Sequence, residues 1–172
     1  ITIIGPRSVG KTTVAKLLAK SLYYEHREGD AIMQELLKEH GGISAVLKNK
    51  QRDILVEKMP EWLDIAYKGD RIVFDCTSGT IDFKDYPQEN KKNVAKIKEK
   101  SKVIGLLPHK QFNDGINILY SREKEREHFK DTDPQALKTK VIKNYRDQLP
   151  LIKNIADIII YTEHKSVAQI VK

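Results

Sequence analysis

Short runs of β-branched and other apolar residues alternate along the chain with longer segments whose apolar residues recur at helical spacing. Residues 1–4, 72–74, 103–107 and 158–161 predict buried strands, and a weaker strand is expected around residues 22–26. Strands that alternate with amphipathic helices are typical of an α/β fold with a parallel sheet. We therefore expect five parallel strands with helices on both faces.

The segments between these strands carry apolar residues three and four positions apart, which predicts helices. Gly41 and Gly42 are expected to end the second helix. Pro60 is expected to break or kink the third, because proline lacks a backbone donor and crowds the preceding turn. Ser166 is a candidate N-cap for a last short helix. The first predicted helix starts near residue 11. The second and third cover about 31–39 and 43–68, and further helices are expected at about 90–100, 112–120 and 134–148.

The composition of the chain limits which cellular compartment and which class of binding partner we expect. The 172 residues suit one domain, 1–172, and no apolar stretch approaches the length of a membrane span. A single cysteine, Cys76, excludes a disulfide framework and fits a reducing cytoplasm. The net charge of +7 suits nucleic acid or small phosphorylated anions, but no basic and aromatic stripe supports nucleic acid. We expect a cytoplasmic monomer that acts on a small molecule.

Residues 5–12 read GPRSVGKT and fit the phosphate-loop pattern G-x-x-x-x-G-K-[ST] at every fixed position. The loop directly follows a predicted strand and precedes a predicted helix, so its backbone N–H groups and the helix dipole can cradle phosphate oxygens. Lys11 would reach the β- and γ-phosphates, and the Thr12 hydroxyl would ligate Mg²⁺. The residues predicted to contact ATP and Mg²⁺ are Gly5, Pro6, Arg7, Ser8, Val9, Gly10, Lys11, Thr12 and Thr13.

Classes of phosphate-loop protein differ in their further motifs. The segment 49–52 reads NKQR and lacks the acid of the guanine-binding element N-K-x-D, and no transporter signature L-S-G-G-Q is present. The chain leaves little room for a motor or an oligomeric ATPase. A compact kinase of small molecules remains, which needs an acceptor-binding segment, expected at about 28–60, and a mobile lid, expected at about 121–134.

An acidic pair follows the loop, with Glu28 and Asp30 standing 17 and 19 residues after Lys11. Further on, 51–53 read QRD and 150–157 read PLIKNIAD. Together with the loop, these segments resemble the shikimate kinase family over nearly the whole chain. The resemblance implies that Glu28 helps to hold Mg²⁺ through water, that Asp30 binds acceptor hydroxyls and that Arg52 grips an acceptor carboxylate. The residues alone also allow Asp30 to be a helix cap and Arg52 an exposed helical residue.

The segment after the second strong strand reads DCTSG over 75–79 and falls where the family has a glycine triplet. Only Gly79 is kept, and the resemblance implies that it contacts the acceptor. Asp75 ends the strand as a Mg²⁺-ordering acid does in many phosphate-loop proteins, although a plain turn residue is the alternative. Cys76 is expected to be a small buried residue rather than a nucleophile.

The charged stretch after the third strong strand resembles the family's lid. Arg122 and Arg126 match two lid-region arginines, which implies that one flanks adenine and the other contacts the transferring phosphates. A solvated helix end with Glu–Arg pairs is the alternative. The family's acceptor-binding arginine falls on Gln148. The nearest arginine, Arg146, stands two residues earlier and is the candidate for that acceptor-binding role.

These observations predict a three-layer phosphate-loop kinase that transfers the γ-phosphoryl group of ATP·Mg²⁺ to an acceptor hydroxyl. Lys11, Asp30 and Arg126 are the expected catalytic residues, and Thr12, Glu28 and Asp75 are the expected metal-site residues. Shikimate is the leading acceptor. A nucleoside or nucleotide acceptor stays open, as does a nucleotide-binding module without turnover.

Overall fold

The structure is a computed structural model that describes residues 1–77, 79–129 and 132–172. Ser78, which belongs to the glycine-triplet segment, and residues 130–131 of the expected lid lie outside the described residues. The strands are β1 (Thr2–Ile4), β2 (Glu25–Glu28), β3 (Ile72–Asp75), β4 (Val103–Leu107) and β5 (Ile158–Tyr161). The helices are α1 (Lys11–Leu22), α2 (Gly29–Leu36), α3 (Gly42–Lys48), α4 (Arg52–Ala66), α5 (Pro87–Lys100), α6 (Phe112–Lys124), α7 (Pro134–Ile155) and α8 (Val167–Val171), with 3₁₀ turns at Lys38–His40 and Glu127–Phe129.

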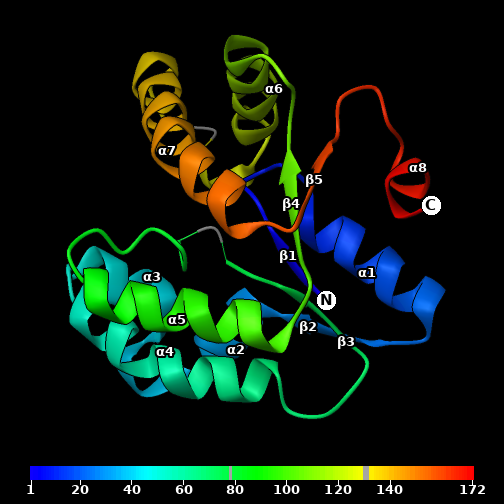
Figure 1. Ribbon diagram of the computed structural model, residues 1–172. Coiled ribbons are helices and arrows are strands. Elements are labelled where there is room, and N and C mark those ends of the chain that lie inside the picture. The colour runs from blue at the N-terminus through cyan, green and yellow to red at the C-terminus, as the bar shows by residue number, and fades with distance from the viewer. Residues whose placement is uncertain (78, 130–131) are drawn as a thin grey trace.

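The five strands form one parallel sheet in the order β2-β3-β1-β4-β5, as the alternation of strands and helices predicted. Figure 1 shows α1 and α8 on one side of the sheet and the group α2 to α5 on the other. The helix α6 stands beyond the tip of β4, at the carboxyl edge of the sheet, and α7 runs from beside α6 down to the flank of β4, where Ile152 lies next to Gly105 (Figure 1). Ligands of open α/β sheets bind at this edge.

Two predicted helix boundaries around proline are wrong. The expected helix over 43–68 is two helices, and the break falls at residues 49–51, where Lys50 adopts a positive φ of 58°. Pro60 lies inside α4, which continues through it because Met59, Trp62 and Leu63 are buried in the core on either side. Likewise α7 continues past the expected end at 148 to Ile155, with Pro150 inside it.

Smaller corrections concern where elements begin. The weak strand lies at Glu25–Glu28 rather than around 22–26, so Glu28 ends β2. The helix expected over 31–39 is α2, which begins earlier at Gly29, followed by a 3₁₀ turn. The helix α5 begins at Pro87 rather than at 90, because proline suits the first helical position. Ser166 caps α8 as expected, in a reciprocal capping box with Gln169.

The core surrounds the sheet, and its largest fully buried side chains include Trp62, Phe74 and Tyr145. Trp62 and Phe74 meet edge to face at 5.0 Å between ring centroids, which ties α4 to β3. Tyr145 stacks on Phe112 at 5.2 Å, which ties α7 to α6. Among the described residues, no helix is long and apolar enough to cross a membrane.

Candidate active site

The phosphate loop occupies the turn between β1 and α1, at the carboxyl edge of the sheet. Its first glycine packs against the neighbouring strand, since a Cβ on Gly5 would stand 2.6 Å from the Leu106 carbonyl oxygen. Its second glycine, Gly10, has a φ of 102°, a conformation that residues with a side chain rarely adopt. Both glycines of the pattern therefore have a structural reason. Gly5 is needed because the neighbouring strand comes so close, and Gly10 is needed because of its backbone conformation.

Lys11 stands at the first position of α1 with its amine turned back into the loop. Its Nζ donates to the carbonyl oxygens of Gly5 and Pro6, each at 3.1 Å. Burial lowers the pKa of Lys11, while the neighbouring Cys76, Asp30 and Asp75 act in the opposite direction. The amine thus lies within the electrostatic reach of two carboxyl groups at the loop.

Asp75 ends β3 with its carboxylate only 4% exposed. Its Oδ1 accepts the backbone N–H of Gly29 at 3.1 Å, and its Oδ2 lies 3.7 Å from Nε2 of His26. Within the described part of the chain, that Oδ2 has no hydrogen-bond partner. Asp75 belongs to β3 and not to a turn, and a buried carboxylate oxygen without a donor suits a metal-bound water or a metal ion.

Glu28 and Asp30 flank Gly29 at the end of β2. Glu28 pairs in register with Asp75 on the adjacent strand, and its Oε2 lies 3.6 Å from Nζ of Lys16. Asp30 lies at the second position of α2, whose N-cap residue is Glu28, so Asp30 is not the helix cap. Asp30 is exposed to solvent, but partial burial of its carboxyl group raises its pKa, and Asp75 and Glu28 raise it further, against the opposing charges of Lys11 and Arg7.

Gly29 and Trp62 position this acidic segment, and the sequence motifs pointed to neither of them. The indole Nε1 of Trp62 donates to the Gly29 carbonyl at 2.8 Å. A Cβ on Gly29 would stand 2.7 Å from the Asp75 carbonyl oxygen and 2.8 Å from a Trp62 ring carbon. A fully buried tryptophan three turns into α4 therefore fixes the backbone between the two candidate acids.

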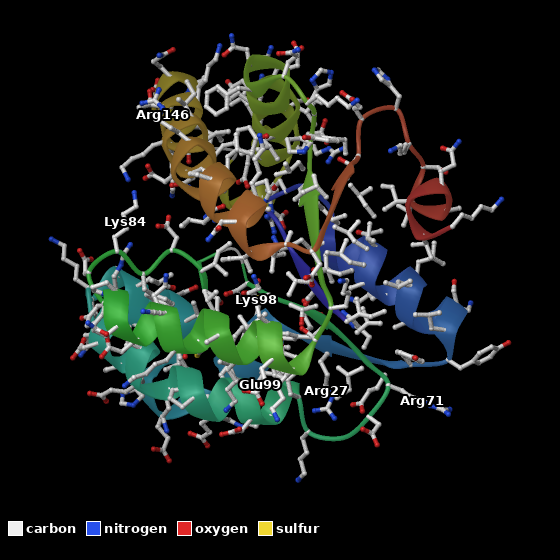
Figure 2. The ribbon with its side chains drawn as sticks, viewed as in Figure 1. Arg27, Arg71, Lys84, Lys98, Glu99 and Arg146 are labelled. Atoms are coloured by element: carbon white, nitrogen blue, oxygen red, sulfur yellow. The ribbon has the colours of Figure 1, made fainter. Side chains whose placement is uncertain are left out.

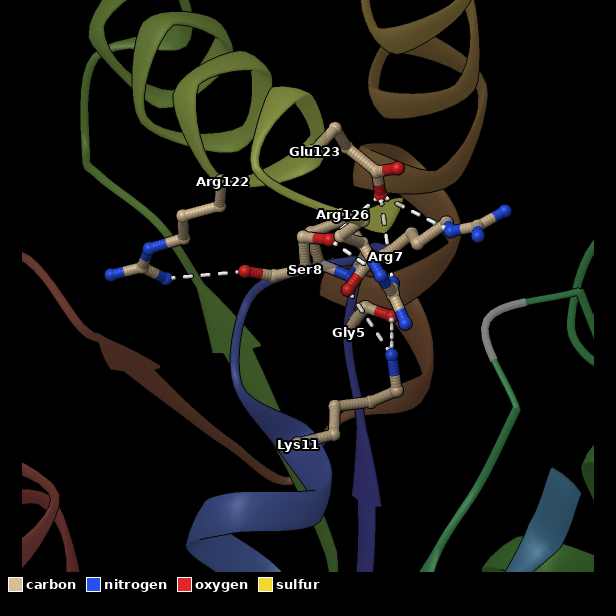
Figure 3. A network of polar contacts seen from close by, with 8 residues as sticks. Gly5, Arg7, Ser8, Lys11, Arg122, Glu123 and Arg126 are labelled. Atoms are coloured by element: carbon tan, nitrogen blue, oxygen red, sulfur yellow. Dashed lines mark hydrogen bonds and ion pairs between the residues drawn. The ribbon is translucent and has the colours of Figure 1, made fainter. Parts of the chain in front are cut away.

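The two arginines of the expected lid contact the phosphate loop directly (Figure 3). Arg122 donates through NH1 to the carbonyl oxygens of Ser8 and Val9, at 3.3 and 3.2 Å. Arg126 donates through NH1 to the Ser8 hydroxyl at 3.3 Å. Since Arg122 is tied to loop carbonyls, the end of α6 and the apex of the loop are held together.

Glu123, which sequence reasoning missed, lies between these arginines with its side chain 4% exposed. Its Oε1 accepts the Ser8 hydroxyl at 2.7 Å and lies 3.2 Å from Nε of Arg7 and 4.0 Å from NH1 of Arg126 (Figure 3). The guanidinium of Arg7 also stands over the Phe129 ring at 4.8 Å. A run of charged residues in the sequence gave no signal that this one carboxylate is buried.

Besides Asp30, three further residues are predicted to bind the acceptor, and all three are exposed. Arg52 begins α4 with its side chain 62% exposed, 3.8 Å from an Asp85 carboxylate oxygen. Gly79 is exposed, and a Cβ there would meet nothing within 4 Å. Arg146 is exposed on α7, and Figure 2 shows it on the outer side of that helix. Gln148 is buried and lines a cavity of about 30 Å³ with Arg7 and Lys140.

The donor set fits a metal that is held jointly with a nucleotide. Among the described residues, no group of three or more His, Cys, Asp or Glu side chains could hold a metal by itself. Mg²⁺ commonly takes one or two carboxylates and completes its shell with water and substrate phosphates. Thr12 of the loop, Glu28 and Asp75, whose buried Oδ2 has no hydrogen-bond partner among the described residues, are the residues that would supply that smaller set.

Three comparisons with known proteins place this geometry in context. The family model for shikimate kinase matches residues 7–172. A search of curated proteins found no match. Among solved structures, a shikimate kinase from Bacteroides thetaiotaomicron is similar at 19% identity and a TM-score of 0.76, with 99% of this chain and 92% of that chain covered.

Two further structures show the range of the likeness. A shikimate kinase from Acinetobacter baumannii in complex with shikimate has 20% identity and a TM-score of 0.68, covering 99% of this chain and 87% of that one. A deoxyadenosine kinase from M. mycoides with bound dATP has 18% identity and a TM-score of 0.54, covering 98% and 94%. At these identities the structures establish the fold, and the family rests on the match over residues 7–172.

Proposed function

The chain belongs to the shikimate kinase family of ATP-dependent kinases, and on that premise we propose that it phosphorylates a hydroxyl group of a small acceptor, with shikimate as the leading candidate. One observation carries the proposal: the amine of Lys11 lies in the phosphate loop, near enough to Asp30 and Asp75 for both carboxylates to raise its pKa against the effect of burial. A cation for phosphate and two carboxylates with different surroundings are the parts that phosphoryl transfer needs.

The chain's cations stabilise the charge of the transferring phosphoryl group. Lys11 leaves the carbonyl oxygens of Gly5 and Pro6, which it contacts in this structure, and donates to the β- and γ-phosphate oxygens. Arg126 swings from the Ser8 hydroxyl onto the γ-phosphate, where its guanidinium meets the spread negative charge of the transition state. Arg122 keeps the loop apex in place by holding the carbonyls of Ser8 and Val9.

Asp30 orients the acceptor hydroxyl and takes its proton. A raised pKa makes this carboxylate a better base than an ordinary aspartate. As the acceptor oxygen bonds to the γ-phosphorus, the bond from that phosphorus to the β-phosphate oxygen breaks, and the proton moves to Asp30. ADP carries away the electron pair of the broken bond.

Thr12, Glu28 and Asp75 form the proposed metal site. When bound, Mg²⁺ neutralises charge on the β- and γ-phosphates. Thr12 would ligate it through its hydroxyl, and Asp75 and Glu28 would order its water ligands from the ends of β3 and β2. The N–H of Gly29 keeps the Asp75 carboxylate in one orientation for that task.

The acceptor would lie between Asp30 and the start of α4, where Arg52 can bind a carboxylate. The structure of the Acinetobacter baumannii enzyme with shikimate supports a small hydroxylated acid as the acceptor. Gly79 and Arg146 are the further proposed acceptor contacts. For Arg146 to take part, its guanidinium must move from the outer side of α7.

The test is ADP release with a panel of acceptors at saturating Mg·ATP. We expect release that depends on shikimate and is lost when the acceptor hydroxyl is absent. Release with a nucleoside or nucleotide and none with shikimate would replace the acceptor but keep the kinase. The deoxyadenosine kinase with a TM-score of 0.54 makes a nucleoside the specific second choice. Binding of Mg·ATP without release for any acceptor would instead favour a module that has lost turnover.

A further inference from the structure

Glu123 is a nearly buried carboxylate whose partners are the groups that a phosphate would need. The Ser8 hydroxyl and the Arg7 guanidinium belong to the phosphate loop, and Arg126 belongs to the expected lid. A buried carboxylate is costly unless donors compensate it, so these contacts hold three donors to one anion. The Glu123 carboxylate is thus the anion that these donors contact here, in the way that they would contact a nucleotide phosphate.

The three contacts differ in length and in how firmly each partner is held. The Ser8 hydroxyl is 2.7 Å from the carboxylate, and Nε of Arg7 is 3.2 Å away with its guanidinium also resting on the Phe129 ring. NH1 of Arg126 is 4.0 Å away, and that side chain is 44% exposed. Arg126 is therefore the partner that can leave at the smallest cost, while Arg7 and Ser8 stay (Figure 3).

We infer that Glu123 is a positioning residue that holds Arg126 beside the loop and competes with nucleotide phosphate for it. The inference rests on the proposed function, because it needs a nucleotide phosphate at the loop. In the empty site Arg126 bridges Ser8 and Glu123, so it is stored within reach of the γ-phosphate. A bound γ-phosphate draws Arg126 away, and after that phosphate has been transferred Glu123 takes Arg126 back.

This competition makes a specific prediction for Glu123→Gln. The amide keeps an oxygen for the Ser8 hydroxyl but loses the charge that attracts Arg126 and opposes phosphate. The affinity for Mg·ATP, measured without an acceptor, should rise about threefold to tenfold, the range that a coupled charge pair gives. The KM for ATP should fall for the same reason.

The decisive experiment is calorimetric titration of Mg·ATP, without an acceptor, into four proteins that form a double-mutant cycle: the wild type, Glu123→Gln, Arg126→Gln and the double variant. If Glu123 acts through Arg126, its substitution tightens binding in the wild-type background and changes it by less than about twofold in the Arg126→Gln background. Glu125→Gln removes the same charge from an exposed neighbour in the adjoining turn, so it measures the effect of charge through solvent.

Each outcome decides the inference. Equal tightening in both backgrounds, or the same tightening in Glu125→Gln, contradicts it, since a general charge effect would then suffice. Thermal melting shows whether each variant folds, and Glu123→Asp replaces Glu123→Gln if the latter does not. The shorter carboxylate cannot reach Arg126 from 4.0 Å, so affinity should still rise, and an unchanged affinity overturns the inference. Absence of Mg·ATP binding in the wild type would instead count against the proposed function.

Discussion

Gly29 occupies a position that only a residue without a side chain can take. Its neighbours, the Asp75 carbonyl and the Trp62 ring, would both stand under 3 Å from an added Cβ. We expect Gly29→Ala to lower the free energy of unfolding by about 1–3 kcal/mol, the usual cost of forcing an extra carbon into a packed site. Equilibrium unfolding in urea measures the change.

Gly79→Ala is the matched control, because a Cβ there meets nothing within 4 Å. Its free energy of unfolding should stay within about 0.5 kcal/mol of the wild type. Equal losses in the two variants would show that the contacts around Gly29 are not what constrains it.

The Cys76 thiol is a buried neighbour of the loop with no reactive role. It is 1% exposed, and burial raises its pKa to about 12. At pH 8 only about one thiol in ten thousand is then a thiolate, which is the reactive form. We expect an aromatic disulfide reagent to leave the native protein unlabelled under conditions that label it fully in guanidinium chloride. Rapid labelling of the native protein would contradict this burial.

Asp30 tests the chemistry proposed for the acceptor side. Asp30→Asn keeps the shape of the side chain but cannot take a proton, so kcat should fall by about 10²- to 10⁴-fold, with the affinity for Mg·ATP little changed. Steady-state kinetics and nucleotide titration measure the two quantities separately. A variant that loses nucleotide affinity and keeps kcat would assign Asp30 to the nucleotide rather than to the acceptor.

Sequence reasoning reached some residues of the site and not others for a physical reason. The loop glycines, Lys11 and the acids at fixed spacings are set by local chain geometry, so a pattern can reveal them. Glu123 and Trp62 act through contacts between residues 115 and 33 positions apart. Nothing local distinguishes Glu123 from the other charged residues around it.

At the scale of elements, α4 shows tertiary packing overriding a local rule. Pro60 lies inside this helix and is exposed, so its missing N–H leaves the helix one hydrogen bond short. We expect Pro60→Ala to raise the free energy of unfolding by about 1–2 kcal/mol, after allowing for the flexibility that the unfolded chain gains. Urea unfolding measures it.

Pro87→Ala provides the comparison, because Pro87 opens α5, where an N–H has no partner within the helix. That substitution should change the free energy of unfolding by less than about 0.5 kcal/mol. If Pro60→Ala proves destabilising instead, the proline is a constraint that α4 needs.

The contrast between local sequence pattern and tertiary packing also explains which elements could be predicted well from the sequence. Four strands are short apolar runs, and their positions agree within a residue with β1, β3, β4 and β5. The edge strand β2 reads Glu-His-Arg-Glu, so it has no apolar pattern and owes its structure to pairing with β3. The break at 49–51 contains neither glycine nor proline, so no local signal marked it. The expected break or kink was therefore assigned to Pro60 instead.

At the scale of the whole molecule, the strand order places the site. From β1 the chain crosses to one side of the sheet for β2 and β3 and then to the other side for β4 and β5. The loop after β1 therefore stands at the switch point, where a crevice opens at the carboxyl edge. The Lys84 amine, on the segment before α5, reaches Asp147 of α7 at 2.9 Å, so the two sides are also joined across the edge.

We propose above all that residues 5–12 bind the phosphates of a nucleotide. The most direct test is calorimetric titration of Mg·ATP into the wild type and into Lys11→Met. Methionine keeps the length of the side chain and removes its charge, and thermal melting checks that the variant folds. The account predicts measurable binding by the wild type and an affinity at least tenfold lower in the variant. No heat with the wild type, or equal affinity in the two proteins, would contradict it.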